Sequence, residues 1–421
     1  MTVASQIGRA YSLARERYAA RGVDTEVALT ALAAVPLSLH CWQGDDVQGF
    51  MSQDDMVGSG LVATGTYPGR ARTAEELRDD LDMALRLIPG THRVNLHAIY
   101  AETDGQADRD ALTPGHFARW IEWARSRRLG LDFNGTFFAH PLAVNGLTLS
   151  HPDAGVREFW IRHGTACREI GEAMGRTLGT PSVVNVWIPD GSKDLPADRQ
   201  APRERLRVSL DALFAKPNDP RYQLDALESK LFGIGSECYV VGSHEFYLGY
   251  AIQRQKVLCL DSGHFHPTES IADKISALLP YLDRLLLHVS RGVRWDSDHV
   301  VILSDELRAL AQELVRCQAL SRVHIGLDYF DASINRIAAW VVGMRSMQIA
   351  LLIALLEPQQ KLRELELAGD RTGVLALFEE CKTLPFAAVW DHCCSQHDVP
   401  TGADWLGEIR IYEKDVLSAR A

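Results

Sequence analysis

The sequence Val257-Leu-Cys-Leu-Asp-Ser-Gly-His-Phe265 joins four apolar residues to a polar segment that carries Asp261 and His264. A short apolar run that ends in polar residues is typical of a buried parallel strand with functional groups at its carboxyl end. Seven other runs share this form: residues 36–42, 93–100, 130–136, 181–190, 222–230, 284–291 and 322–330. Together with 257–265, they predict eight strands.

Segments with helical periodicity separate these runs. They are residues 73–88, 114–127, 155–174, 202–214, 243–253, 270–282 and 305–317. Strands and helices that alternate along a chain form parallel βαβ units. Eight such units predict a closed α/β barrel, the (β/α)8 or TIM barrel, rather than an open sheet.

The barrel is expected to be flanked by further elements. We assign residues 1–35 to N-terminal helices, 36–333 to the catalytic barrel and 334–421 to a C-terminal helical extension. Asp331 has the position of an N-cap, which predicts a helix from there to Leu356. A helical tail beyond a closed barrel has little of the barrel core to pack against, so we expect it to contact another subunit. Residues 43–70 form a long polar loop, which is usually a lid or a disordered insert, and we favour a lid.

Composition narrows the class of protein. The 421 residues carry a net charge of −11, which argues against a nucleic-acid partner. The eight cysteines form no C-x-x-C pair, so neither a zinc ribbon nor a disulfide framework is expected. No signal peptide is evident, and the most apolar stretch, from Ile349 to Leu356, is too short to span a membrane. We therefore expect a cytoplasmic protein with no membrane partner.

Residues able to bind metal ions occur at the ends of the last four strands. Glu228 and Lys230 are two residues apart, so they share one face of their strand. Gly263 lets the chain turn, so that Asp261 and His264 can face one centre. The candidate metal ligands are Glu228, Asp261, His264, His288, Asp296, Asp298 and Asp328.

The chemistry of these ligands predicts two divalent ions. Several carboxylates in one barrel mouth repel strongly unless cations lie among them. Carboxylate and imidazole suit Mn²⁺, Mg²⁺, Co²⁺ or Zn²⁺, and seven ligands are too many for one ion. A single Asp or His at a strand end is more often a cap or a satisfied polar group, and only its repetition favours a metal site. Asp331 could replace Asp328, although its position favours a helix cap.

Nine blocks of the sequence, in their order and spacing, resemble the L-rhamnose isomerase family within the xylose-isomerase-like barrel superfamily. They are SLHCWQGDD (38–46), RVNLHAIY (93–100), TLSH (148–151), VWIPDG (186–191), ESKLFGIG (228–235), LDSGHFHPTE (260–269), LHVSR (287–291), VRWDSDH (293–299) and GLDYFDASINR (326–336). The blocks extend over nearly the whole chain and contain every candidate metal ligand.

The resemblance implies an aldose–ketose isomerase that interconverts L-rhamnose and L-rhamnulose in rhamnose catabolism. It also implies Mn²⁺ as the ion, a homotetramer, and a tolerance of other aldoses. A structural ion would bind Glu228, Asp261, His288 and Asp328. A catalytic ion would bind His264, Asp296 and Asp298.

Aldose–ketose conversion moves one hydrogen between C1 and C2 and one proton between O1 and O2. An enediol relay needs a side-chain base near the substrate. A metal-assisted 1,2-hydride shift instead needs a cation that polarises the carbonyl and stabilises the alkoxide. The sequence offers many metal ligands and few unassigned carboxylates, which favours the hydride shift, as the resemblance also does.

Other residues are assigned to the substrate, each beside a plainer interpretation. Lys230 would place a positive charge near O1, or it only pairs with a carboxylate such as Glu228. His97 would hydrogen-bond the ring oxygen or O5, or it is a satisfied core histidine. Trp42 and Trp187 would line the pocket and pack against the sugar, or they are core side chains. Lys230, Asp298 and His97 are the expected catalytic residues.

Three alternatives stay open. One is a different sugar isomerase of the same superfamily, the second is a metal-dependent hydrolase or endonuclease on a similar barrel, and the third is an inactive sugar-binding barrel. The acidic charge counts against an endonuclease, and the full set of ligands counts against an inactive barrel. His40, His266 and His299 are assigned nothing beyond support of the ligands.

Overall fold

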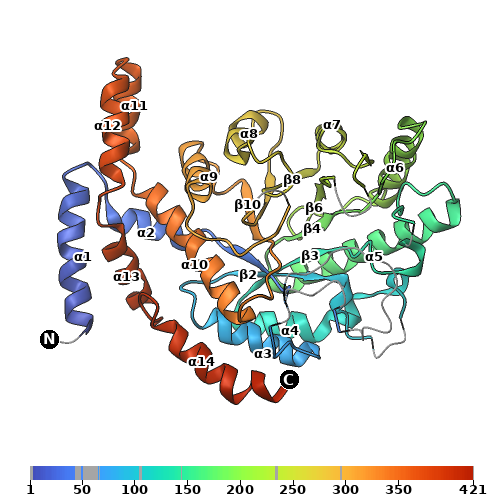
Figure 1. Cartoon of the computed structure of the whole chain (residues 1–421), viewed down its shortest axis with the longest axis horizontal. Helices are drawn as coiled ribbons and strands as arrows, with labels where there is room; N and C mark the ends of the chain where they lie inside the picture. Colours follow the sequence, from blue (N-terminus) through green and yellow to red (C-terminus); the bar gives the residue numbers. More distant parts are fainter. Residues whose placement is uncertain are drawn as a thin grey trace.

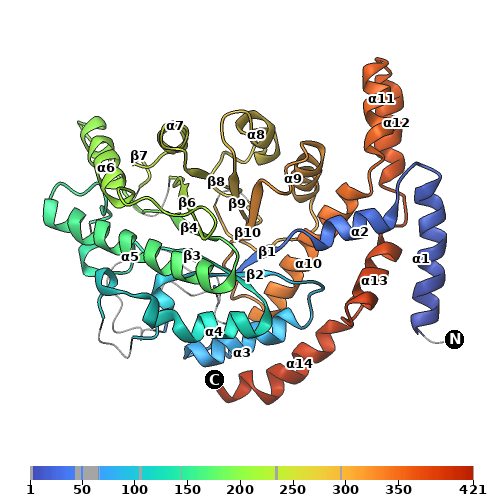
Figure 2. The ribbon, with the colours of Figure 1, turned by 180° about the vertical axis from the view of Figure 1, so that it is seen from behind.

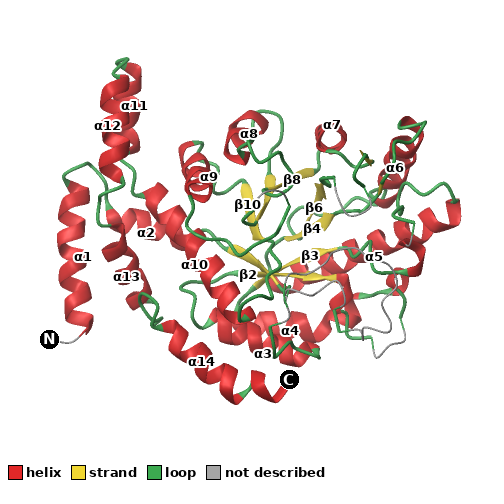
Figure 3. Cartoon of the chain, in the orientation of Figure 1, coloured by secondary structure: helices red, strands yellow, loops and turns green. Residues whose placement is uncertain are grey.

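Eight parallel strands close into a barrel, as predicted (Figure 3). The structure is a computed structural model that describes residues 3–42, 49–50, 65, 67–103, 107–143, 145–232, 236–293 and 296–420. In chain order the barrel strands are β1 (Leu37–His40), β2 (Arg93–His97), β3 (Gly130–Asn134), β4 (Ser182–Val186), β6 (Gln223–Glu228), β8 (Val257–Asp261), β9 (Leu285–Val289) and β10 (Val323–Leu327). β1 pairs with both β2 and β10, which closes the sheet.

Each strand is shorter than its predicted run. β8, for example, ends at Asp261 rather than at Phe265, and β9 ends at Val289 rather than at Arg291. Several strands end on a polar residue that faces the mouth of the barrel, such as Glu228 on β6 and Asp261 on β8, and the residues beyond them leave the sheet. All five residues of β2, β3, β4, β8 and β9 are buried, because the barrel interior covers one face and helices cover the other.

Within the described residues, seven helices connect the strands, and each overlaps one predicted helical segment. They are α3 (Ala74–Leu85), α4 (Ala118–Arg127), α5 (Ala154–Leu178), α6 (Gln200–Leu213), α7 (His244–Arg254), α8 (Ile271–Leu278) and α9 (Asp305–Arg316). Side-chain caps start several of them: Thr73 accepts from the backbone N–H of Glu76, and Ser304 accepts from that of Leu307.

The helix after the last barrel strand, α10 (Arg336–Leu355), begins later than predicted. Asn335 caps it by accepting from the N–H groups of Ile337 and Ala338. Asp331 instead accepts from the backbone N–H of Ser333 at 3.0 Å, in a local turn. The predicted cap at Asp331 is therefore wrong, because a second capping residue lies four positions further along the chain.

α10 packs against α9, α2 (Thr25–Ala33), α3 and β1, in the position of an eighth barrel helix. It contains the apolar stretch from Ile349 and is itself 20 residues long, so its length and composition would suffice to cross a membrane. Its most apolar window is 83% buried inside the fold. The helix therefore has the burial of a core helix.

The remaining helices extend to one side of the barrel (Figures 1 and 2). They are α1 (Val3–Ala19), α11 (Gln359–Leu367), α12 (Arg371–Cys381), α13 (Phe386–Gln396) and α14 (Trp405–Asp415). α1 packs on α13, while α11 and α12 pair and project away from the barrel. The chain then returns beside α3, where Arg420 donates to the buried Asp80 at 2.7 Å. The predicted division between barrel and extension at residues 333 and 334 stays a prediction.

Two features outside the barrel bear on the site. A two-stranded antiparallel ribbon, β5 (Gly191–Ser192) and β7 (Tyr239–Val240), ties the loop after β4 to the loop after β6. Short 3₁₀ turns occupy Ala98–Tyr100, Arg109–Ala111, Pro114–Phe117, Pro141–Ala143 and Leu417–Arg420. The predicted lid, residues 43–70, lies mostly outside the described residues, which include only 49–50, 65 and 67–70 of it.

Candidate metal centre

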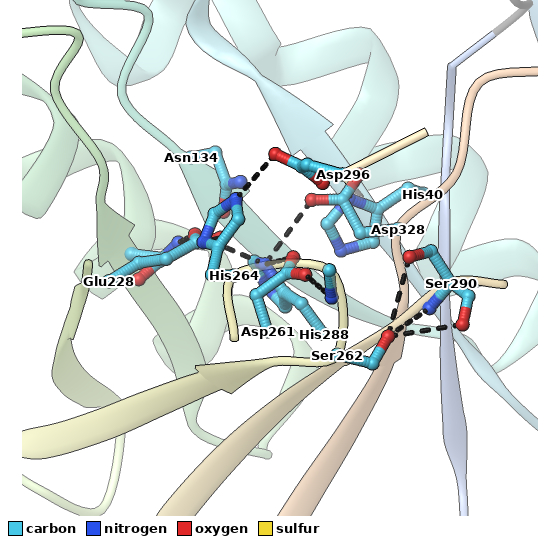
Figure 4. Close-up of polar contacts among 12 residues, drawn as sticks. His40, Asn134, Glu228, Asp261, Ser262, His264, His288, Ser290, Asp296 and Asp328 are labelled. Atoms are coloured by element: carbon cyan, nitrogen blue, oxygen red, sulfur yellow. Dashed lines mark hydrogen bonds and ion pairs between the residues drawn. The ribbon is translucent and has the colours of Figure 1, made fainter. Parts of the chain in front are cut away.

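The candidate ligands come from consecutive strand ends. Glu228 is the last residue of β6, and Asp261 is the last residue of β8. His288 lies one residue before the end of β9, and Asp328 follows β10 directly. Because all barrel strands are parallel, these ends open on the same mouth. Figure 4 shows the four side chains turned toward a common centre.

One group consists of these four residues. Each offers a ligand atom, and the four atoms lie within 4.8 Å of one another. His288 Nδ1 is 3.1 Å from Glu228 Oε2 and 3.2 Å from Asp328 Oδ2. The same nitrogen is 4.0 Å from Asp261 Oδ2. The residues that the resemblance assigns to one ion are thus close enough to share it.

A second group consists of Asp261, His264 and Asp296, whose ligand atoms also lie within 4.8 Å of one another. His264 Nε2 is 3.1 Å from Asp296 Oδ2. Gly263 makes this approach possible, because a Cβ at that position would lie 2.3 Å from Asp296 Oδ1. Its backbone N–H also donates to Asp261 Oδ1 at 2.7 Å. Asp261 belongs to both groups and would lie between two ions.

Asp298 is placed differently from the other candidates. It lines the adjoining pocket but belongs to neither group of ligand atoms. Its φ of +43° lies in the left-handed region, which few residues other than glycine adopt. Burial, together with the charges of Asp296 and Asp261, raises the pKa of Asp298 well above its ordinary value. Its ligation therefore stays a prediction from the sequence.

The electrostatics of the groups favour bound cations. Burial and the charges of Glu228 and Asp296 raise the pKa of Asp261 well above its ordinary value. Burial alone would lower the pKa of His264, but Asp261 and Asp296 raise it well above its ordinary value. The carboxylates thus cannot all ionise without positive charge among them.

The donor set also fits a divalent metal. Among the described residues, Nδ1 of His288 and Nδ1 of His264 are buried without a well-formed hydrogen bond, and they lie 3.1 and 3.6 Å from the carboxylate oxygens of Glu228. Buried polar atoms are normally satisfied, so these nitrogens are free to ligate. Carboxylate oxygens with imidazole suit Mn²⁺, Co²⁺, Zn²⁺ or Mg²⁺. Asn185 Nδ2 also donates to Glu228 Oε2, the oxygen that faces His288 Nδ1.

A pocket adjoins both groups. The described residues that line it are Trp42, His97, Asn134, Gly135, Phe138, Trp187, Glu228, Asp261, His264, Asp296, Asp298, Asp328 and Phe330. Trp42 lies against His97, with ring centroids 3.7 Å apart, and against Phe330 at 4.8 Å. The indoles of Trp42 and Trp187 thus form walls of the pocket. Asn134, Phe138 and Phe330 were not assigned from the sequence.

His97 and Lys230 differ in their access to this pocket. Both ring nitrogens of His97 are buried without a partner among the described residues, and burial lowers its pKa well below the ordinary value. A neutral imidazole can donate from one nitrogen and accept at the other. Lys230 is not one of the described lining residues, and its Nζ donates to Ser236 Oγ at 3.1 Å. Burial lowers its pKa to about 8.

The fold and the site together define a (β/α)8-barrel enzyme whose strand ends can hold divalent cations. The model of the L-rhamnose isomerase family matches residues 5–420. The L-rhamnose isomerase of Rhodopirellula baltica is 60% identical over 421 residues, which cover 100% of this chain and 99% of that protein. The L-rhamnose isomerase of Salmonella paratyphi B is 59% identical over 417 residues, 99% of this chain and 100% of that one.

The chain therefore belongs to the L-rhamnose isomerase family, whose members are aldose–ketose isomerases. The resemblance found in the sequence is confirmed. Among solved structures, the chain is similar to an L-ribulose 3-epimerase with a TM-score of 0.48 and 12% identity, over 80% of this chain and 99% of that one.

Proposed function

We propose that this chain interconverts L-rhamnose and L-rhamnulose by a metal-assisted 1,2-hydride shift, with two Mn²⁺ ions per subunit. The supporting observation is the pair of ligand groups that share Asp261 beside a pocket with aromatic walls. The full-length identity of 60% to a named L-rhamnose isomerase supports the choice of substrate. Bound in the two groups, the ions would polarise the substrate carbonyl and stabilise negative charge on its oxygens.

The other residues of the pocket would bind and orient the sugar. His97 can hydrogen-bond the ring oxygen or O5 through its unpartnered nitrogens and so help the ring to open. The indoles of Trp42 and Trp187 can pack on the C–H faces of the sugar and exclude water. Lys230 would hold positive charge on the O1 side, and Ser236 fixes its present position.

The hydride shift is favoured over an enediol relay. The carboxylates among the described lining residues are Glu228, Asp261, Asp296, Asp298 and Asp328. Four belong to the ligand groups, and Asp298 is expected to join them. No carboxylate of this lining is thus left over as a separate base. In the shift, hydrogen leaves C2 with its electron pair and forms the new bond at C1, while one proton passes from O2 to O1.

An isotope experiment separates the two routes. L-rhamnose deuterated at C2 is incubated with the Mn²⁺-loaded enzyme in H₂O, and the product is analysed by NMR. A hydride shift retains the deuterium at C1 of L-rhamnulose, because the atom never meets solvent. Loss of most of the label to water would support the relay and contradict the shift. Turnover compared over a panel of aldoses, as kcat/KM, tests the preference for rhamnose.

The assignment of the second group is tested by Asp296→Asn. The substitution removes one charged ligand from Asp261, His264 and Asp296, so we expect kcat/KM to fall by about 100-fold or more. The metal-free variant should unfold no more easily than the metal-free parent, because one repelling carboxylate is gone. Activity within a few-fold of the parent, with two ions still bound, would contradict the assignment.

We propose further that the protein is a cytoplasmic homotetramer without nucleic-acid or membrane partners. Exposed apolar side chains lie on the terminal helices: Leu13 on α1 is 65% exposed, Leu367 on α11 is 90% exposed, and Ile411 on α14 is 63% exposed. Packing of these side chains on another subunit would bury them. The net charge of −11 disfavours contact with phosphate backbones. Light scattering coupled to gel filtration measures the mass directly.

A further inference from the structure

His40 is the last residue of β1, and the proposed function gives it no part. Its side chain is only 1% exposed. Nδ1 of His40 lies 3.1 Å from Asp328 Oδ1. The indole Nε1 of Trp42 donates to the same oxygen at 2.9 Å. The other oxygen, Oδ2, is the one that faces His288, at 3.2 Å (Figure 4). The two oxygens of Asp328 therefore have different surroundings.

The far side of the His40 ring fixes which nitrogen carries the proton. Nε2 of His40 lies 3.1 Å from the amide nitrogen of Asn95, which also donates to Asn134 Oδ1 at 3.3 Å. An amide nitrogen only donates, so Nε2 accepts, and the proton of a neutral ring is on Nδ1. Nδ1 can then donate to Asp328. A polar chain thus runs from Asn134 through Asn95 and His40 to Asp328, and its last link is the 3.1 Å contact between His40 Nδ1 and Asp328 Oδ1.

The neighbouring backbone leaves room for this ring. A Cβ at Gly326 on β10 would lie 3.1 Å from His40 Nε2 and 3.2 Å from His288 Cδ2. The rings of His40 and His288 meet edge to face, with centroids 4.8 Å apart. Because residue 326 has no side chain, the rings of His40 and His288 can pack edge to face within the barrel.

We propose that His40 is a positioning residue for the first metal group: it holds Asp328 Oδ1 so that Oδ2 faces the ion, and it does not ligate the ion itself. The proposal rests on the two-ion site of the proposed function. The competing arrangement is direct ligation, because nitrogen and oxygen atoms of His40, His288 and Asp328 also lie within 4.8 Å of one another. The orientation of Nε2 toward Asn95 favours positioning, since Nδ1–H is then a donor and not a ligand.

Two substitutions at one position separate these arrangements. His40→Ala removes the donor to Asp328. His40→Asn places an amide N–H near the position of Nδ1–H. Because the amide oxygen of asparagine could itself ligate Mn²⁺, direct ligation is tested separately by pulsed EPR of the Mn²⁺-loaded proteins: His40→Ala should keep every ¹⁴N coupling of the parent, and loss of one would show that His40 ligates. Free Mn²⁺ is measured by EPR during titration of metal-free protein, which gives the number of ions bound and their Kd. Loss of an outer hydrogen bond to a ligand typically weakens metal affinity about 10- to 100-fold.

We expect His40→Ala to raise one of the two Kd values by about 10- to 100-fold and leave the other within a few-fold. His40→Asn should stay within a few-fold of the parent. At saturating Mn²⁺, the alanine variant should recover most of its kcat with an unchanged KM, because His40 is not among the described lining residues of the pocket. A parental Kd in His40→Ala, equal losses in both variants, or a raised KM would overturn the proposal.

Ser38→Ala is the matched control. Ser38 lies on the same strand, is also buried, and donates to a carboxylate, that of Asp132, at 2.7 Å. Asp132 is not part of either ligand group, so this variant should bind Mn²⁺ as the parent does. Thermal unfolding of the metal-free proteins checks that all variants are folded. If the parent itself bound no divalent ion, the proposed two-ion site would fail, and that result is distinct from any difference among the variants.

Discussion

At the scale of single residues, Ser38 and His40 on β1 each contact the carboxylate of a different aspartate. Both side chains are buried, and each faces an aspartate on another strand or strand end. Asp132 also receives two hydrogen bonds from Arg93, each at 2.8 Å, and one from the backbone of Val183 at 2.9 Å. Burial would raise the pKa of Asp132, but the charge and hydrogen bonds of Arg93 outweigh it and leave the pKa below its ordinary value.

We expect Ser38→Ala to lower the free energy of unfolding by about 1.5–3 kcal/mol at pH 7, the range for a hydrogen bond to a charged group. Because the pKa of Asp132 is lower in the folded state, this stabilisation is complete above the unfolded value of about 3.9. It is lost as pH falls through the folded pKa. Urea unfolding of parent and variant at pH 7 and near pH 3, at one protein concentration, measures the difference.

The same experiment has a clear contrary result once a second variant is added. If Ser38→Ala lowered the free energy of unfolding as much in an Asp132→Asn background as in the parent, Asp132 would not be acting as an ionised acceptor. The stabilising effect of Ser38 would then come from packing alone. A shift of the urea slope between the two proteins would indicate a changed unfolded state instead.

At the scale of elements, the β5–β7 ribbon holds the surroundings of Lys230. Ser236 Oγ accepts from Lys230 Nζ at 3.1 Å and donates to the carbonyl of Pro189 at 3.3 Å. Gly191 leaves the space for this serine, because a Cβ there would lie 2.3 Å from Ser236 Oγ. The lysine is thus placed by contacts between two loops that are far apart in the sequence.

Gly191→Ala should therefore lower kcat/KM by about 10- to 100-fold, since a small misplacement of a functional group has effects of that size. Overpacking should also lower the free energy of unfolding by about 1–3 kcal/mol. Mn²⁺ affinity should not change. The control is Gly249→Ala on α7, where an added Cβ meets nothing within 4 Å. Parental kinetics in Gly191→Ala would show that Lys230 does not depend on the ribbon.

The elements also show what the sequence could predict. Buried parallel strands are continuous apolar runs, so the sequence predicts all eight, but each predicted run extends past the end of its strand. The start of α10 was misplaced because Asp331 and Asn335 are both capable caps, and only the folded chain selects one. Similarly, Phe138 and Phe330 resemble core residues in sequence, and only the barrel turns them into the pocket.

The candidate ligands were predictable for a different reason. Carboxylate and imidazole at successive strand ends must meet, because parallel strands open on one mouth. The sequence predicts at most a supporting role for His40, and it could not show which ligand His40 supports, because that contact joins β1 to the end of β10. The position of Asp298 depends on its left-handed backbone within a loop, which no local pattern predicts. Their roles in metal binding stay predictions.

At the scale of the whole molecule, the barrel mouth concentrates negative charge in a chain that already carries a net charge of −11. The proposed ions would neutralise this charge and join strand ends from β6 to β10, so metal binding and stability should be linked. An ion present at 100 times its Kd stabilises the folded state by about 2.7 kcal/mol. Each of the two ions would contribute in this way, and their contributions would be coupled because the groups share Asp261.

Exhaustive chelation should therefore abolish turnover and lower the Tm, and added Mn²⁺ should restore both. Differential scanning calorimetry and a ketose assay at fixed protein concentration measure the two effects. General screening also stabilises an acidic protein, so KCl at matched ionic strength is the control: it should raise the Tm less than Mn²⁺ does and should not restore activity. Asp296→Asn should gain less stability from Mn²⁺ than the parent, because one of its groups has lost a charged ligand. Full turnover after chelation would refute metal-assisted chemistry at this site. If added Mn²⁺ restored the Tm but not the activity, the ions would have only a structural role.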